Sequence, residues 1–420
     1  MNRKILTNSI WMMSEKLVTM FGLIFVVSYV AKYVGTTIFG QIALATSLFQ
    51  ITLVIAQLGS DVIIFKRISK NHKSGVKLIT ATLPMRGLIY ILISIPVVFF
   101  THKTGDVNGF IFIIACFASC FFSSIDVFSM YYDAKLESMR NTIANIFGLI
   151  VSLILRWVIV FFHVDVKFLA IPIIFASLIP FLIRLYFFKR HNSMKVGSSR
   201  HRNKYKKYLI MSGFSFVIST LSVAIYARLS IILLGFMSSG PSVGVFSVSI
   251  TLAGAWSFIL TSLITSNLPS IFSEKDELKA IKLASKLNAM IVIISLIIIS
   301  FVSIFGDYFI RKLYGIDFID AYKPLLILSF STMISSLGII SARFIARSSG
   351  YSFLSKKMLC VALFSLVINI PLINFYGLTG AATATLLTEI VSLTFFNYFF
   401  KKGIILKLHL STLFVNKILK

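Results

Sequence analysis

Charged residues are scarce in this sequence, and acidic residues are the scarcest among them. Charged side chains make up 13% of the chain, with 14 Asp or Glu against 41 Lys or Arg. Soluble domains normally carry about 25% charged residues, so this composition argues against a soluble globular protein. The hydrophobic fraction of 57% and the mean hydropathy of +0.92 agree with that conclusion.

Residues that build metal centres, disulfide frameworks or nucleotide sites are also few. The three cysteines, Cys116, Cys120 and Cys360, show neither metal-ligand spacing nor a disulfide framework, and the six histidines form no metal-binding pair. The sequence contains no Walker loop, so we expect no ATP hydrolysis by this chain. We expect no cofactor, no metal and no catalytic residues.

Long apolar segments are abundant instead. Segments of about 20 apolar residues recur, the length that a helix needs to cross about 30 Å of hydrocarbon. They lack the alternation of outer-membrane barrel strands. We therefore predict an all-α polytopic membrane protein with twelve transmembrane helices, the first retained because Glu15 and Lys16 interrupt its apolar run and no small-residue cleavage site follows. The expected spans are 10–33, 38–59, 77–100, 109–132, 140–162, 167–188, 208–236, 243–269, 285–309, 323–347, 355–374 and 379–401.

A basic stretch near the middle of the chain separates six of these segments from the other six. Lys189–Lys207 carries eight Lys or Arg and no acid. A basic run can also bind nucleic acid, but the apolar flanks favour a cytoplasmic linker, so we expect no nucleic-acid partner. The predicted domains are an N-terminal six-helix lobe at 1–188, the linker at 189–207, a C-terminal six-helix lobe at 208–402, and a basic amphipathic cytoplasmic tail at 403–420 on the inner leaflet.

The distribution of Lys and Arg over the loops predicts the orientation. If the N-terminus is cytoplasmic, inside segments hold 29 Lys or Arg and outside segments hold 6. Positive residues are retained on the cytoplasmic side, so both termini are expected in the cytoplasm. The outside loops are all short, and the longest, about 307–322, is too small for a folded catalytic domain.

The two halves of the chain share a weak internal sequence similarity. Gly35–Leu48 (GTTIFGQIALATSL) and Gly240–Leu252 (GPSVGVFSVSITL) each place a glycine turn before a helix of small residues. Parallel repeats of this kind are common in transporters, which bind substrate between the halves near the bilayer midplane. Glycine turns before helices are also frequent in chains without a repeat, so this similarity alone does not establish one.

Three motifs resemble the Wzx-type polysaccharide flippases of the multidrug/oligosaccharidyl-lipid/polysaccharide exporter superfamily. Asn8–Gly40 is similar to the family's opening helix and its Arg-x-Leu-Gly and Phe-Gly turn, with Lys32 and Val34 in place of Arg and Leu. The other two are LGSDVIIFKR at Leu58–Arg67 and YGLTGAATATLLTE at Tyr376–Glu389. The Asp-Arg pair usual late in helix 7 is here Ala227 and Arg228, so an acid is missing.

The resemblance implies a fold and a function. Such proteins place two six-helix lobes, related by a pseudo-two-fold repeat, in a V-shaped arrangement like that of MATE transporters, around a cationic cavity. They flip an undecaprenyl-pyrophosphate-linked oligosaccharide, an O-antigen or capsule repeat unit, from the inner to the outer leaflet of the bacterial inner membrane. Many are thought to be coupled to an ion gradient. The implied partners are this lipid-linked substrate, membrane lipids and the polysaccharide polymerase with its chain-length machinery.

Charges inside the predicted helices are the candidate site, because each costs about 2.5–3.5 kcal/mol on insertion scales. Arg156, Arg184 and Arg343 lie near helix ends and are expected to snorkel to the surface. The deeper cations are expected to bind the substrate pyrophosphate and sugars, with structural ion pairing as the alternative. These candidates are Lys16, Arg86 and Arg228.

Three acids accompany these cations within the helices. Glu15, Asp126 and Glu389 are expected either to carry a coupled ion or to balance the charge of the cavity. Because helices 3 and 4 form an antiparallel hairpin, we also expect Arg86 and Asp126 to be ion-pair partners.

Two other functions remain open at this point. A multidrug or organic-cation exporter of the same superfamily would favour an acidic cavity, whereas the deep charges here are mostly basic. A membrane-embedded polysaccharide polymerase or ligase would need a sizeable outer loop with catalytic Arg, His or Glu, and the short loops disfavour it.

Overall fold

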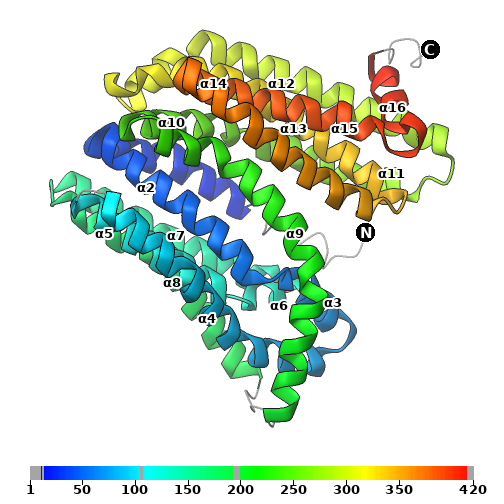
Figure 1. The fold of residues 1–420 in the computed structure, drawn as a ribbon, viewed down its shortest axis with the longest axis horizontal. Helices are drawn as coiled ribbons and strands as arrows, with labels where there is room; N and C mark the ends of the chain where they lie inside the picture. Colours follow the sequence, from blue (N-terminus) through cyan, green and yellow to red (C-terminus); the bar gives the residue numbers. More distant parts are fainter. Residues whose placement is uncertain (1–10, 12–13, 105–106, 193–198, 414–420) are drawn as a thin grey trace. The chain divides into compact units, whose positions relative to one another are not determined.

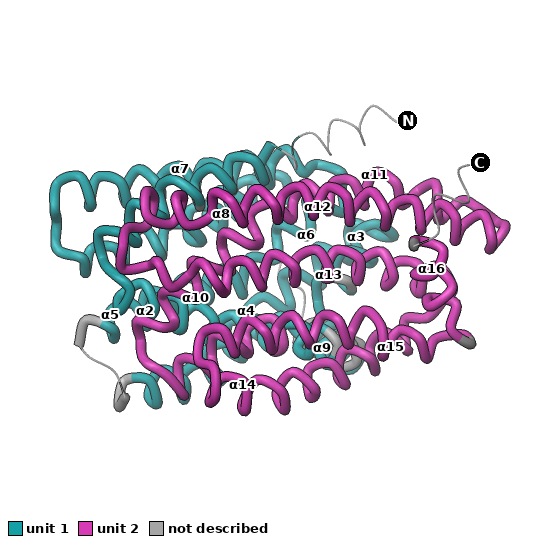
Figure 2. The backbone as a smooth tube through the Cα atoms, turned by 90° about the horizontal axis from the view of Figure 1, so that it is seen from above, with its two compact units in different colours: residues 1–224 teal, residues 225–420 magenta. Residues whose placement is uncertain are grey.

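The computed structural model describes residues 11, 14–104, 107–192 and 199–413, which are mostly helical and contain no β-strand (Figure 1). The chain forms two compact units, Met1–Ala224 and Ile225–Lys420 (Figure 2). Their boundary falls inside one long helix, α9 (Ser199–Met237). The predicted linker at 189–207 includes residues 193–198, which lie outside the described residues.

Unit 1 is an all-helical bundle followed by the first part of α9. After a helical segment at 14–21, its elements are η1 (Gly22–Val26), α2 (Val27–Gln57), α3 (Ser60–Lys70), α4 (His72–Thr104), α5 (Val107–Ile125), α6 (Phe128–Ala134), α7 (Ser138–Phe161), η2 (Val166–Leu169) and α8 (Ala170–His191).

Unit 2 repeats this all-helical architecture after the rest of α9. Its elements are α10 (Gly240–Ala255), α11 (Ser257–Ser273), α12 (Glu277–Leu313), η3 (Ile316–Ala321), α13 (Tyr322–Arg347), α14 (Tyr351–Leu393), α15 (Phe395–Tyr398), η4 (Lys401–Gly403) and α16 (Ile404–Leu413).

Ten helical segments among the described residues are long and apolar enough to cross a membrane. Two of them, Ser14–Gln57 with 44 residues and Tyr351–Tyr398 with 48, are about twice as long as one crossing requires. Each is broken at a glycine with positive φ, Gly35 at 74° and Gly377 at 55°, a conformation that favours glycine. Dividing both segments at these glycines gives twelve crossings, consistent with the predicted number.

The break at Gly377 folds α14 back on itself. The Ser230 hydroxyl donates to Asn369 Oδ1 at 2.9 Å and lies 2.9 Å from Thr385 Oγ1, and these two partners stand on either side of Gly377. One side chain of α9 therefore holds both halves of α14 together. The polar contacts satisfy groups that would be costly to bury alone in an apolar bundle.

The outer faces of the long helices are apolar. Large side chains such as Phe99, Ile304 and Phe375 are exposed on the protein surface. Exposing apolar area to water costs about 25 cal/mol per Å², whereas lipid tails carry no such penalty. The exposed apolar faces therefore support the assignment to a multi-pass membrane protein.

Over residues 404–413 the predicted basic tail is a helix docked on unit 2. Ile405 and Leu408 of α16 are fully buried, and the Ser285 hydroxyl donates to the Leu408 carbonyl at 3.0 Å. His409 lies 3.1 Å from both Ser341 Oγ and Tyr398 OH, and its burial lowers its pKa to about 4. The imidazole is therefore neutral when α16 is docked. Residues 414–420 lie outside the described part of the chain.

We expect docking of α16 to weaken in acid. The pKa of His409 rises from about 4 when docked to 6.5 when released, so the stabilisation is complete above pH 6.5 and is lost as the pH falls through this window. Hydrogen–deuterium exchange of 404–413, corrected for intrinsic rates, should show about 3 kcal/mol less protection at pH 4.5 than at pH 7.5. His409→Gln should abolish this pH dependence; an unchanged pH dependence in that variant would refute the role of His409.

Candidate functional site

The packing of α7 against α8 positions the most highly connected buried charge of unit 1. The Ser152 hydroxyl donates to the Pro172 carbonyl at 2.8 Å, and a Cβ at Gly148 would meet Pro180 Cδ at 2.5 Å. Glycine is therefore needed for the two helices to approach this closely. This close contact brings the next turn of α8, which carries Arg184, against the polar face of α7.

Arg184 contacts three polar side chains, one of which continues to a fourth. Its guanidinium, in a residue 5% exposed, forms an ion pair with Asp126 and donates to Asn141 Oδ1 at 3.1 Å and to Asn145 Oδ1. Asn145 Nδ2 then donates to Glu15 Oε1 at 2.8 Å. One amide therefore links Arg184 on α8 to the acid of the first helical segment.

The expectation that Arg184 snorkels to the surface is wrong. Its side chain is buried because a guanidinium has five N–H donors in a planar fork, and this site offers a carboxylate and two amide oxygens to receive them. Asp126 itself lies between α5 and α6, where its carboxylate also accepts a hydrogen bond from the backbone N–H of Phe128. The acid is thus fixed from two directions.

Arg86 occupies a second buried cluster at the break between α2 and α3. Leu58 and Gly59 both adopt left-handed conformations there. Arg86, 1% exposed, donates from Nη1 to Ser60 Oγ at 2.8 Å, and its Nη2 lies 3.9 Å from Asp61 Oδ1. The charge of the arginine is therefore balanced by the acid that begins α3.

The predicted ion pair between Arg86 and Asp126 is therefore wrong. Arg86 pairs with Asp61 and Asp126 pairs with Arg184. Asp126 still interacts favourably with Arg86 at longer range. The prediction paired Arg86 with Asp126 because both lie at a similar depth in neighbouring helices. The acid closest to Arg86 is instead Asp61, which follows the break between α2 and α3.

Unit 2 holds its own buried polar group around Glu389. The Tyr226 hydroxyl donates to Glu389 Oε1 at 3.2 Å, and Ser335 supplies a second side-chain hydrogen bond. Lys357 interacts electrostatically with this carboxylate and is only 6% exposed. Nothing in the sequence separates Lys357 from its exposed neighbour Lys356.

The two remaining sequence-predicted cations belong to different units. Lys16 is exposed and follows Glu15 in the helical segment at 14–21 of unit 1. Arg228 is partly buried on α9 in unit 2, two residues after Tyr226. Their roles toward substrate stay predictions. Of the predicted residues, the structure joins Glu15 to Asp126 through Asn145 and Arg184, a connection that sequence reasoning missed.

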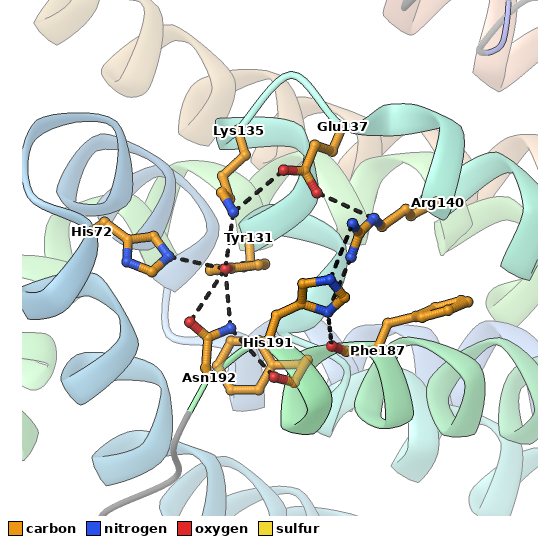
Figure 3. A network of polar contacts seen from close by, with 9 residues as sticks. His72, Tyr131, Lys135, Glu137, Arg140, Phe187, His191 and Asn192 are labelled. Carbon is orange, nitrogen blue, oxygen red and sulfur yellow. Dashed lines mark hydrogen bonds and ion pairs between the residues drawn. The ribbon is translucent and has the colours of Figure 1, made fainter.

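A polar network joins the ends of α4, α6 and α8 in unit 1 (Figure 3). Tyr131 is its centre: the hydroxyl lies 2.9 Å from His72 Nε2 and accepts hydrogen bonds from Lys135 Nζ at 3.3 Å and Asn192 Nδ2 at 3.0 Å. The Lys135 ammonium also lies over the Tyr131 ring. These contacts fix the helix ends next to the basic loops.

The same network extends to α7 through Glu137. Its carboxylate lies 3.3 Å from Lys135 Nζ and 3.2 Å from Arg140 Nε. His191 Nδ1–H donates to the Phe187 carbonyl at 2.8 Å, which leaves Nε2 to accept from Arg140. These contacts tie the end of α6 and the start of α7 to the end of α8. Within the described residues, no group of three or more His, Cys, Asp or Glu could hold a metal ion.

Sequence comparisons point to polysaccharide biosynthesis. A family model described as "Polysaccharide biosynthesis protein" matches residues 5–275. A capsular polysaccharide biosynthesis protein, CapF of Staphylococcus aureus, is 21% identical over 260 residues. That match covers 60% of this chain and 65% of CapF, just under two thirds of the relative's length.

Solved structures share the fold along almost the whole chain. The lipid II flippase MurJ in an inward closed conformation matches with a TM-score of 0.72 at 14% identity, covering 98% of this chain and 92% of the other. An inward-facing multidrug resistance MATE family transporter of the MOP superfamily matches with a TM-score of 0.65 at 16% identity, covering 98% and 100%. At these identities the likeness shows the fold.

We expect Arg184 and Asp126 to be energetically coupled. Arg184→Met should destabilise the protein by about 3–5 kcal/mol, because it leaves the Asp126 carboxylate buried without its partner. Adding Asp126→Asn should recover part of this loss. Thermal unfolding of the purified variants in detergent measures both effects.

The matched control combines Asp126→Asn with Arg86→Met, which removes an arginine that is not the ion-pair partner of Asp126. The structure predicts little recovery in this second double variant. Recovery with Arg86→Met and none with Arg184→Met would show that the pairing described here is wrong.

Proposed function

Because the chain belongs to the polysaccharide biosynthesis protein family, we propose that it flips an undecaprenyl-pyrophosphate-linked oligosaccharide from the cytoplasmic to the periplasmic leaflet. The protein is a multi-pass membrane protein with the fold of MOP superfamily transporters. Two observations together support the proposal: the family model matches residues 5–275, and the chain has the same fold as the lipid II flippase MurJ. The mechanism we propose is alternating access.

The proposed location is the inner membrane of a bacterium, with both termini in the cytoplasm. The bias of 29 inside to 6 outside Lys and Arg supports this orientation. The proposed partners are the lipid-linked substrate, the surrounding lipids and the polymerase that consumes the flipped repeat unit.

Cations on the membrane-spanning helices suit this substrate because its pyrophosphate loses hydration when it leaves the headgroup zone. Fixed Lys and Arg in a site of low dielectric replace that hydration. In our proposal Lys16 and Arg228 contact the anion, and Arg86 adds positive potential while holding the break between α2 and α3. Binding by a few dispersed cations leaves the anion free to dissociate on the other side.

The acids divide into two proposed roles. Asp126 is ion-paired with Arg184, so it balances charge. Glu15 and Glu389 are instead held by neutral donors, Asn145 in one unit and Tyr226 in the other. Because neither acid has an ion-pair partner among the described residues, these two are the proposed groups for coupling to an ion gradient.

Other functions agree less well with the described residues. A cation exporter needs an acidic cavity, whereas the best-buried ionised side chains here are Arg86, Arg184 and Lys357. A polymerase or ligase needs a catalytic outer loop, whereas α12 and α13 are joined through a short 3-10 helix, Ile316–Ala321.

Deletion of the gene in its own bacterium tests the proposed function. We expect undecaprenyl-pyrophosphate-linked repeat units to accumulate on the cytoplasmic leaflet and surface polysaccharide to be lost, with recovery when the wild-type gene is restored. Normal surface polysaccharide without accumulation would contradict the proposal.

Complementation of that strain tests the proposed cations. Lys16→Ala and Arg228→Ala should each lower export about tenfold or more, the cost of one lost charged hydrogen bond, at normal protein level. Lys16→Arg should keep export, because charge rather than shape is required there.

The matched control is Lys279→Ala, which removes an exposed cation on the first turn of α12. It should leave export unchanged. If Arg228→Ala at normal abundance supports full surface polysaccharide, Arg228 has no role in passing the anion.

A further inference from the structure

Lys357 is a buried cation that the residues around it do not neutralise at close range. It lies near the start of α14 and is 6% exposed. Among the described residues, no carboxylate lies within ion-pair distance of its ammonium; the six ion pairs all involve other cations. Glu389 acts on Lys357 electrostatically, but from a longer distance.

Glu389 forms no close ion pair with Lys357, because its carboxylate is hydrogen-bonded to other groups. Tyr226 OH donates to the carboxylate at 3.2 Å from α9, and Ser335 donates from α13. An ammonium has three N–H donors. None of the described residues accepts a hydrogen bond or forms an ion pair at the Lys357 ammonium, so its donors are available to an additional acceptor.

A neighbouring polar cluster in the same helices shows the contrast. Ser230 hydrogen-bonds to both Asn369 and Thr385, and Asn369 Nδ2 also donates to the Ser365 carbonyl at 2.8 Å. That cluster is neutral and satisfied by its own members. Lys357 is charged, and its only described acidic partner remains at a distance.

We propose that Lys357 is an anion-binding residue of unit 2 that takes a phosphate-type oxyanion. When the site is empty, Glu389 supplies the compensating negative charge at longer range. The inference deepens the proposed function, on which it rests, because the pyrophosphate of a lipid-linked substrate is one source of such an oxyanion. The phosphate of an anionic phospholipid is the other source.

The sign and shape of the charge favour this ligand class. A positive residue attracts an anion, and a lysine ammonium is a compact charge that binds phosphate oxygens without the fixed planar geometry of arginine.

The simpler alternative is that Lys357 only balances Glu389. The two explanations differ in the effect of neutralising the acid. If Lys357 binds an anion, Glu389→Gln removes a competing negative charge and should tighten binding. If Lys357 serves only as a counter-ion, neither Glu389→Gln nor Lys357→Met should change the binding of an anion.

Binding to purified full-length protein in detergent tests the proposal. The probes are geranylgeranyl pyrophosphate, phosphatidylglycerol and inorganic pyrophosphate, and the variants are Lys357→Met, Glu389→Gln and, as the matched control, Lys356→Met. We expect Lys357→Met to weaken binding of the preferred probe about tenfold or more, Glu389→Gln to tighten it, and Lys356→Met to leave it unchanged. Preference for the prenyl pyrophosphate would assign the substrate as the source, and preference for phosphatidylglycerol would assign the lipid.

Two results would overturn the inference. One is wild-type affinity of Lys357→Met for all three probes. The other is a Lys357→Met, Glu389→Gln double variant that is as stable as the wild type and binds the probes equally well. The proposed function can fail independently of this site. If the wild-type protein does not restore export in the deletion strain but binds phosphatidylglycerol through Lys357, flipping is contradicted and the anion site is supported.

Discussion

The cost of placing an ionised group in an apolar bundle is the constraint on which the polar interior of this protein depends. A buried arginine without a partner would destabilise the bundle by several kcal/mol. Arg184 avoids this cost with one carboxylate and two amides, and the second amide reaches Glu15 on another helix. The same contacts that neutralise the charge therefore connect four separate segments of unit 1.

Helix breaks supply the acids for both buried arginines. Asp61 follows the left-handed turn at Leu58 and Gly59, and Asp126 lies between α5 and α6. A broken helix exposes backbone groups, which is tolerated at membrane depth only where protein groups satisfy them. The paired charges thus stand where the helices are interrupted, and those are the places where a transporter helix is able to bend without losing additional hydrogen bonds.

The sequence predicted the class, the long apolar helices and the two-part organisation, because composition and segment length depend on the membrane rather than on packing. It also predicted correctly that Glu15 and Glu389 lie within helices, whereas Asp126, predicted to lie inside a helix, stands in the break between α5 and α6. The sequence did not predict which side chains contact one another. Depth along a helix follows from counting residues, but rotation about the helix axis depends on packing: Lys356 is exposed and Lys357 is buried. The partner of Asp126 could not be deduced for the same reason.

The central claim is that this chain moves a lipid-linked oligosaccharide across a bilayer, and reconstitution tests it most directly. Purified protein would be placed in liposomes that contain a labelled undecaprenyl-pyrophosphate-linked oligosaccharide in the inner leaflet only. The measurement is the rate at which the label becomes accessible to a membrane-impermeant reagent outside. The account predicts a faster rate than in protein-free liposomes; equal rates, with and without an imposed ion gradient, would contradict it.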